Sequence, residues 1–330
     1  MRITTLGSYP KIPYDNGPNV RSAIQRFERK SIGPFELDQV FLRRTRHVLQ
    51  VAEQNELDLT SDGLIRWNDM FDGVVRDFDN VSSAGLLRLF DNNFYYRHPL
   101  IRGRLSFQGG VVRWWLKEAV ASSKVPIKAV LPGPFTFLKL SQDDSYHNSD
   151  ALLEDLVEVL RLEALSLADV GIAEVQWDEP ALAYYPDWNM TKVAATLAQL
   201  TAQQPLPQAL ALYWGSGVGR WLQPLSGVGF SRLYLDAVSD PGVVSTITNN
   251  PPACEVGLGL VDARQVKKES VDELARQLQP VVRRLGESNV WLHPSSGLEL
   301  LPPDHAEAKV RILRDVRDTI RGSSGNGGLG

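Results

Sequence analysis

The chain has 330 residues, 43% of them apolar and 22% charged, a composition that excludes disorder as its main state and predicts a globular protein with a large core. Its net charge of −4 at pH 7 provides no basic stripe for a phosphate backbone, so we expect no nucleic-acid partner. A single cysteine, Cys254, excludes a disulfide framework. The start lacks a secretion signal and no apolar run approaches about 18 residues, so we expect a cytoplasmic protein with no membrane partner.

Short apolar or β-branched runs alternate with helical patterns along the chain, which is typical of a parallel sheet with crossover helices. Eight such runs can be counted: Ile3–Thr5, Leu57–Thr60, Ile127–Leu131, Ile172–Trp177, Ala209–Tyr213, Arg232–Leu235, Val256–Val261 and Val290–His293. Eight parallel strands close a barrel. The sequence therefore predicts the α/β fold class, as a (β/α)8 TIM barrel in which residues 1–322 form one domain.

The segments between these runs carry the helical period. One predicted helix has its apolar residues between Ala151 and Leu165, behind a cap at Ser149 or Asp150. The same period recurs between Val193 and Leu200 and between Val271 and Val282. Each of these helices follows its strand closely, as a barrel requires.

Two stretches depart from this alternation. Residues 73–123 are too long for one crossover, so we expect an insertion between the second and third strands, with a hairpin around Gly103–Gly110. At the other end, Pro302 and Pro303 lead into a final helix that ends near Arg321. Residues 323–330 are rich in glycine and serine and are predicted to form a disordered tail.

Loops that follow the strands' C-terminal ends form the active site of a barrel of this kind, so polar residues placed there are informative. This filter, together with the resemblance described below, gives five candidate catalytic residues: Asp178, Glu179, Tyr213, Asp236 and His293. The candidate substrate-binding residues are Ser8, Asp62, Asp178, Trp214 and Ser296. Several carboxylates on one rim can bind an ammonium group or perform acid and base chemistry when burial separates their pKa values.

Each of these residues also has a structural interpretation. A strand-end acid can cap the next helix or pair with arginine, but for Asp178 and Glu179 we favour function, because the segment DEP follows a buried strand whose end faces the barrel mouth. Asp262 fits a pair with Arg264 better. Trp214 is interpreted as core more readily than as a stacking surface, and GSGVG as a tight turn more readily than as an anion cradle.

Six segments occur in order over nearly the whole chain: TTLGSYP, SDG with the later NDM, GPFTFL, VQWDEPAL, GLGLVDAR and GLELLPPDHAEAKVRIL. In this order they resemble the signature segments of the cobalamin-independent methionine synthase catalytic domain, in its short stand-alone form. The resemblance implies methyl transfer from a folate or corrinoid donor to the sulfur of homocysteine. It also implies a zinc ion that lowers the thiol pKa so that the thiolate attacks.

The zinc ligands that the resemblance implies would stand at Tyr213, Gly215, Asp236 and Ser296. One carboxylate with a tyrosine and a serine does not reproduce a soft nitrogen and sulfur site, and Cys254 lies before the seventh strand, at the other end of the barrel. We therefore predict no metal site, with the family's zinc ligands replaced.

Two further departures concern recognition. The family's acidic residue in its DGE segment aligns with Leu64, and the tryptophan of its pterin-stacking surface aligns with Leu140. Ser8 and Asp178 are retained, and the resemblance implies that they contact the carboxylate and amino group of an amino-acid substrate. Amino-acid binding is therefore less altered than methyl transfer.

These features predict a diverged methionine-synthase-like methyltransferase that acts on a small, amino-acid-like acceptor. Asp178 or Glu179 would orient the acceptor, Ser8 would bind its carboxylate, and Asp236 with Tyr213 or His293 would move the proton. We expect no tightly bound cofactor, and methyltetrahydrofolate or a methylcorrinoid as methyl donor.

Two alternatives remain open. One is a catalytically silent paralogue that binds a ligand and acts through a protein partner. The other is a metal-free lyase or decarboxylase similar to the uroporphyrinogen decarboxylases. The latter class needs an arginine-rich segment near the start, where this chain has only Arg21 and Arg26.

Overall fold

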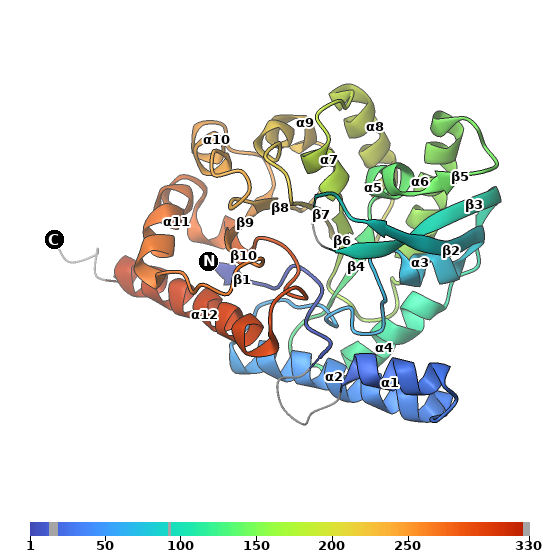
Figure 1. Cartoon of the computed structure of the whole chain (residues 1–330). Coiled ribbons are helices and arrows are strands. Elements are labelled where there is room, and N and C mark those ends of the chain that lie inside the picture. Colours follow the sequence, from blue (N-terminus) through green and yellow to red (C-terminus); the bar gives the residue numbers. More distant parts are fainter. Residues whose placement is uncertain (13–18, 92–93, 326–330) are drawn as a thin grey trace.

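The computed structural model describes residues 1–12, 19–91 and 94–325, and its centre is a barrel of parallel strands (Figure 1). Seven strands follow one another around the wall, in the order β1 (Arg2–Ile3), β10 (Val290–Pro294), β9 (Glu255–Val261), β8 (Arg232–Asp236), β7 (Gln208–Leu212), β6 (Glu174–Asp178) and β4 (Lys128–Pro132). Leu59 and Thr60 close the gap between β1 and β4 through single parallel bridges to Thr4 and Ile127. The predicted (β/α)8 barrel is confirmed, with bridges in place of a full second strand.

Helices surround the barrel as the helical periods predict (Figure 1). They are α1 (Val20–Glu28), α2 (Pro34–Gln54), α5 (Pro134–Leu140), α6 (Ser149–Ser166), α7 (Pro180–Tyr184), α8 (Met190–Thr201), α9 (Leu222–Leu225), α10 (Val243–Asn249), α11 (Val271–Leu285) and α12 (Pro303–Gly325), with short 3-10 turns at Gly219–Trp221 and Glu287–Asn289. Helix α12 continues past Arg321 to Gly325, and residues 326–330 of the predicted tail lie outside the described residues.

The predicted cap of α6 is wrong by one residue. Asn148 has the extended backbone that a cap requires, and its side-chain oxygen accepts hydrogen bonds from the amides of Asp150 and Ala151. Ser149 and Asp150 are instead the first residues of the helix.

The predicted insertion between the second and third strands is present. It consists of α3 (Asp72–Asp77), an antiparallel pair β2 (Phe78–Arg88) and β3 (Tyr95–Phe107), and α4 (Val111–Ser122), and β3 also pairs with the short β5 (Gln142–Asp143). The hairpin turn predicted around Gly103–Gly110 is wrong, because Gly103 lies within β3 against the side chain of Asn80. The chain turns between Arg88 and Tyr95, and β2 crosses the view in front of β4 and β6 (Figure 1).

Charged residues fill the interior of the barrel at its lower end, where the strands begin and where branched apolar residues are usual. The Arg232 guanidinium pairs with Glu174 and, at 2.9 Å from Nε to Oε2, with Glu255. The Tyr234 hydroxyl donates to Glu174 (3.0 Å), and the Lys128 ammonium lies 4.2 Å from the Tyr234 ring centre. Since β4, β6, β8 and β9 all contribute, these side chains meet across the interior.

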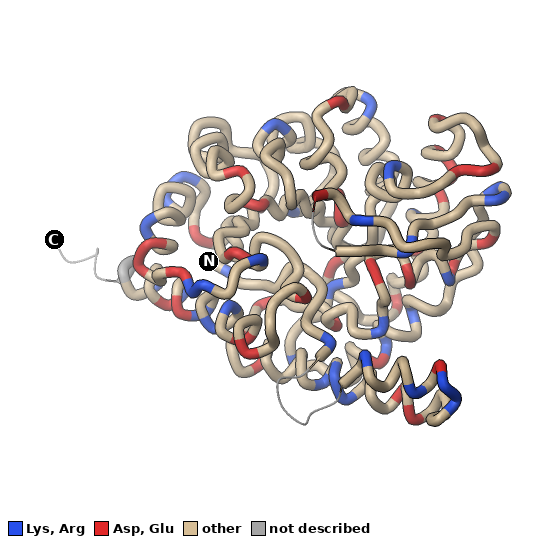
Figure 2. The backbone as a smooth tube through the Cα atoms, in the orientation of Figure 1, with Lys and Arg blue, Asp and Glu red and all other residues tan. Residues whose placement is uncertain are grey.

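Basic and acidic residues are mixed along the outer helices, as Figure 2 shows for α1, α11 and α12. This agrees with the interspersed signs of the sequence. Among the described residues, no helix is long and apolar enough to cross a membrane.

Candidate active site

Asp178 and Tyr213 lie together at the C-terminal ends of β6 and β7. The Tyr213 hydroxyl donates to Asp178 Oδ2 (2.8 Å), and the Gln176 amide donates to Oδ1 (2.7 Å). Burial raises the pKa of Asp178 to about 7, although the two hydrogen bonds favour its ionised form. A carboxyl group with a pKa near 7 can accept or release a proton at neutral pH.

Glu179 points away from this pair, toward the start of α5. Its carboxylate accepts hydrogen bonds from the amides of Phe135 (2.8 Å) and Thr136 (2.7 Å) and from the Thr136 hydroxyl (2.6 Å). Gly133 leaves the space that this side chain fills. Burial raises the pKa of Glu179 to about 7. The contacts are those of a carboxylate that caps a helix N-terminus.

Asp236 and His293 are each engaged locally. Asp236 accepts from the amides of Trp214 (3.1 Å), Val238 (3.0 Å) and Ser239 (2.9 Å) and from the Ser239 hydroxyl (2.6 Å), and burial raises its pKa. The His293 ring is fully buried inside the barrel, with Nδ1 2.7 Å from its neighbour's carbonyl oxygen. Burial lowers the pKa of His293 to about 4, so its ring is neutral at neutral pH.

The other predicted binding residues are spread over the rim. Asp62 is buried, accepts from the Leu64 amide (2.9 Å) and has a pKa raised by burial. Ser296 is also buried. Trp214 has a φ of 66° and packs edge-on against Tyr213, with ring centres 4.9 Å apart. The Phe90 ring, from the loop after β2, lies 6.1 Å from it and 4.6 Å from that of Tyr184.

Ser8 is in contact with an acid that the sequence analysis missed. Its hydroxyl donates to Glu299, which follows β10, and burial raises the pKa of Glu299. Lys11 approaches from the loop after β1 and donates to the carbonyl oxygen of Trp67, and burial lowers the pKa of Lys11. The structure thus brings Ser8 and Glu299 together, with Lys11 close by.

One family of known proteins matches most of the chain. The sequence model described as "Cobalamin-independent synthase, N-terminal domain" matches residues 48–286, more than half of the chain. The chain belongs to the cobalamin-independent synthase family. The resemblance read from the sequence is confirmed at this level, although the segments point to the catalytic domain and the matching model describes the N-terminal domain.

Relatives in this family cover almost the whole chain. The methionine synthase of Sulfolobus acidocaldarius is 23% identical over 96% of this chain and 91% of its own length. The 5-methyltetrahydropteroyltriglutamate–homocysteine methyltransferase of Thermotoga petrophila is 22% identical over 96% of this chain but 44% of its own length. A solved B12-independent methionine synthase from Shewanella, in complex with selenomethionine, has a TM-score of 0.80 at 19% identity and covers 98% of both chains, which shows the shared fold.

The positions that the family resemblance gives to zinc ligands do not fit zinc. Tyr213 donates to Asp178, and Asp236 already accepts four hydrogen bonds from its own loop and the Trp214 amide. A Cβ atom at Gly215 would clash with the backbone of Ala183 in α7, so this position also lacks room for a side chain. Within residues 1–12, 19–91 and 94–325, no three His, Cys, Asp or Glu side chains are arranged to hold a metal ion.

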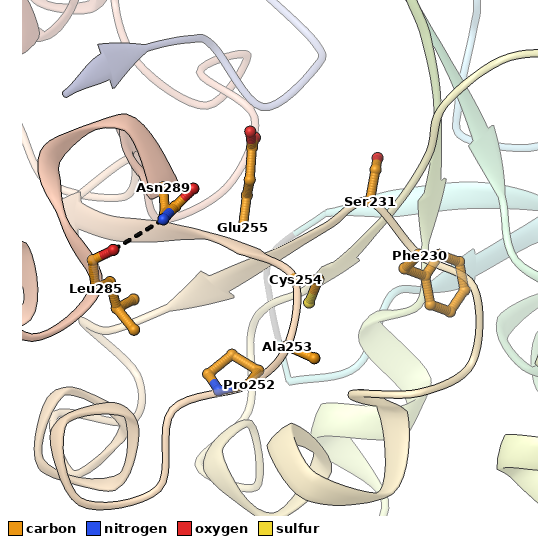
Figure 3. A pocket seen from close by; sticks show the side chains of 8 residues that line it. All are labelled: Phe230, Ser231, Pro252, Ala253, Cys254, Glu255, Leu285 and Asn289. Carbon is orange, nitrogen blue, oxygen red and sulfur yellow. Dashed lines mark hydrogen bonds between the residues drawn. The ribbon is translucent and has the colours of Figure 1, made fainter.

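A pocket of about 320 Å3 lies where β8, β9 and β10 begin, which is the opposite end of these strands from the mouth. Figure 3 shows the residues that line it. It is lined by residues that precede β8, β9 and β10, among them Ser231, Cys254 and Asn289. Asn289 donates to the Leu285 carbonyl oxygen (2.8 Å), and burial raises the pKa of the Cys254 thiol to about 11. The thiol is therefore protonated at neutral pH, and this pocket is separate from the mouth.

Sequence reasoning missed Gln176 and Lys128 as well as Lys11 and Glu299. Lys128 and Gln176 carried a usable signal: Lys128 is the one charged residue of its strand, and Gln176 alternates with the apolar Val175 and Trp177. Burial lowers the pKa of Lys128 to about 7. Glu299 carried no such signal, since it lies beyond the end of its strand in a segment that also leads into α12.

Proposed function

We propose that this chain is a methyltransferase that moves a methyl group to a small, amino-acid-like acceptor without a zinc-bound thiolate. The observation that carries the proposal is the pair of Asp178 and Tyr213 at the barrel mouth, in a chain of the cobalamin-independent synthase family. The mismatch of the four zinc positions supports the zinc-free part of the proposal.

In the proposed reaction Asp178 serves as the base. It removes a proton from the acceptor's nucleophilic atom, whose lone pair then forms a bond to the methyl carbon. The bond between that carbon and the donor breaks, and its electron pair leaves with the donor. Tyr213 and Gln176 hold Asp178 in place through their hydrogen bonds. We propose methyltetrahydrofolate or a methylcorrinoid as donor, bound only transiently.

The test is a methyl-transfer assay on protein dialysed against a chelator, with each donor and a panel of small amines and amino acids, read by mass spectrometry. We expect transfer that persists without metal. Asp178→Asn should lower kcat/KM by about 10²- to 10⁴-fold, the usual loss when a general base is removed.

Asp262→Asn is the matched control, because Asp262 follows β9 on the same rim, and its side chain accepts from the Arg264 amide (2.9 Å). It should leave the rate unchanged. Transfer that requires stoichiometric zinc would overturn the zinc-free proposal, and no transfer with either donor would favour a silent paralogue.

A silent, ligand-binding paralogue is the second candidate function, and three contacts at the rim favour it. The Tyr184 hydroxyl donates to Asp91 (2.5 Å), and Phe90 packs against Tyr184 and Trp214, so Phe90 and Asp91 narrow access to the mouth. In that case the acceptor would bind without reaction.

A further inference from the structure

Three polar atoms inside the barrel have no hydrogen-bond partner among the described residues. They are Nζ of Lys128, Oε1 of Gln176 and Nε2 of His293. All three side chains are fully buried, and they come from β4, β6 and β10. A buried polar group without a partner costs free energy, so native proteins satisfy such groups with protein atoms or with ordered water.

Lys128 and His293 meet at the ring of Tyr234. The Lys128 ammonium lies 4.2 Å from the centre of this ring, and the His293 ring packs edge-on against it with ring centres 5.2 Å apart. Gly257 of β9 leaves the space for this packing, because a Cβ atom there would clash with both Tyr234 and His293. Side chains from β4, β8 and β10 therefore converge in the barrel interior.

Gln176 connects this group to Asp178. Gln176 pairs with Val130 in the register of β6 and β4, so its side chain is on the same inner face as that of Lys128, two residues before Val130. Its Nε2 donates to Asp178 Oδ1 (2.7 Å) and to the Leu6 carbonyl oxygen (2.6 Å). Both hydrogens of the amide are thus used, and Oε1 of the same amide faces the interior without a partner among the described residues.

The three atoms together match the hydrogen-bonding capacity of one water molecule. The Lys128 ammonium can only donate, and Oε1 of Gln176 can only accept. Nδ1 of His293 lies 2.7 Å from the Pro294 carbonyl oxygen, which can only accept, so the neutral ring carries its proton on Nδ1 and Nε2 is an acceptor. A water molecule accepts from the ammonium and donates to both acceptors. A metal ion would be repelled by the ammonium, and an anion would find one donor.

We propose that the barrel interior holds a water molecule between Lys128, Gln176 and His293, and that Lys128 is a positioning residue for Asp178, acting through this water and the Gln176 amide. The water donates to Oε1 of Gln176, and this holds the amide in the orientation in which Nε2 donates to Asp178. Lys128 takes no part in bond formation. Its role for Asp178 rests on the proposed function, in which Asp178 is the base.

The charge of Lys128 also acts on Asp178. Burial is the main cause of the raised pKa of Asp178 and of the lowered pKa of His293, and the Lys128 charge opposes the first shift and adds to the second. The other charged or titratable groups around Lys128 and Asp178 come from β6, β7, β8 and the loop after β10: Glu174, Tyr213, Arg232, Tyr234 and Glu299. Since Lys128→Met keeps all of these groups, loss of the ammonium should make Asp178 harder to ionise.

The first test follows the protonation of Asp178 in the full chain without substrate. Difference infrared spectroscopy detects the C=O stretch of a buried protonated carboxyl group, and its loss in Asp178→Asn assigns the band. The midpoint should lie at about pH 7 in the wild type. In Lys128→Met, which keeps the length of the side chain and removes its charge, the midpoint should be about 0.5–1 pH unit higher. An unchanged or lower midpoint would overturn the inference.

Lys139→Met is the matched control. The Lys139 ammonium also lies over a tyrosine ring, 4.8 Å from the centre of that of Tyr185, but at an exposed position where solvent screens its charge. This variant should leave the midpoint unchanged, and a shift as large as that of Lys128→Met would contradict the inference. Thermal unfolding of both variants checks that they are folded.

A crystal structure of the wild type tests the water directly. It should show one water molecule within about 3 Å of Lys128 Nζ, Gln176 Oε1 and His293 Nε2. An ammonium that bonds directly to Gln176 or His293 would overturn the proposed water.

The pH dependence of methyl transfer separates this inference from the proposed function. Lys128→Met should lower kcat/KM by about 2- to 5-fold at pH 7 and restore it near pH 9, because Asp178 must be ionised to act as a base. The same loss at every pH would indicate a merely structural role and reject the inference. A shifted infrared midpoint without methyl transfer keeps the effect of Lys128 on Asp178 and rejects the methyltransferase. Methyl transfer with an unshifted pH dependence keeps the methyltransferase and rejects the inference.

Discussion

The two ends of the barrel interior hold their carboxylates in different ways. At the lower end, Glu174 and Glu255 both pair with the guanidinium of Arg232, and Glu255 also pairs with Arg2. At the mouth, the donors to Asp178 and Glu299 among the described residues are hydroxyl and amide groups. Carboxylates that are paired within the fold stabilise one arrangement of the strands, whereas buried acids with raised pKa values, such as Asp178 and Glu299, are typical of functional sites.

The largest effect should come from breaking the lower end. Arg232→Met leaves two carboxylates in the barrel without their shared guanidinium, and removal of one partner from a buried pair typically costs about 3–5 kcal/mol. We expect a loss of that size in the free energy of unfolding, measured in urea. Arg311→Met, on the exposed face of α12, is the control and should change stability little. A loss below about 1 kcal/mol for Arg232→Met would show that the pairs are not structural.

A smaller loss should follow an attempt to restore a soft ligand at the mouth. Gly215→Cys forces a side chain against the backbone of Ala183, and overpacking of this kind costs about 1–3 kcal/mol. Gly227→Cys is the matched control, because a Cβ atom there meets nothing within 4 Å. Urea unfolding and elemental analysis should show a destabilised Gly215→Cys protein without zinc. Wild-type stability together with one zinc per chain would contradict the proposed clash.

The smallest effect distinguishes the two ends by the sign of their pH dependence. The pKa of Asp178 is raised by burial to about 7, so the folded protein keeps this proton between pH 4 and 7 while the unfolded chain, with a pKa of about 4, has lost it. Wild-type stability therefore falls as pH rises through this window. Asp178→Asn should melt higher than wild type at pH 8, by on the order of a few °C, and the difference should vanish toward pH 4.

Glu255 supplies the opposite case. Burial, which would raise its pKa, is outweighed by the hydrogen bonds and charge of Arg232, so the pKa of Glu255 is lowered. Its ionised form stabilises the fold at neutral pH, and this contribution is lost as pH falls through its folded pKa. Glu255→Gln should therefore melt lower than wild type at pH 8 and approach it in acid. The same sign for both variants would remove the contrast between the two ends.

The barrel could be predicted from the sequence because each strand is a short apolar run that ends in a polar or glycine-rich turn. The rim position of Asp178 and Tyr213 followed from the same pattern. The position of the hairpin turn did not, since β2 and β3 are irregular and Gly103 occurs within a strand. The local pattern of apolar and polar residues indicates where a strand ends, but it does not indicate which residues pair in the inserted strands β2 and β3.

The orientation of the side chains could not be predicted. The segment DEP has the same pattern whether Glu179 faces the mouth or the start of α5, and the structure shows the second arrangement. The contact between Ser8 and Glu299 joins residues 291 positions apart, so no local period reports it. Ser8 could be predicted because it follows the first strand closely. Glu299 could not, because it lies beyond the end of β10.

Gly297 offers a means of sorting relatives whose structures are unknown. A Cβ atom at Gly297 would clash with the Ser8 hydroxyl and the Glu299 carboxylate, so their contact favours glycine here. Three residues of the sequence therefore indicate the contact: a serine after the first strand, and a glycine after the last strand with an acid two residues later. Relatives that carry all three residues are expected to share this contact. Relatives with a larger residue in place of the glycine, or a basic residue in place of the acid, are expected to lack it.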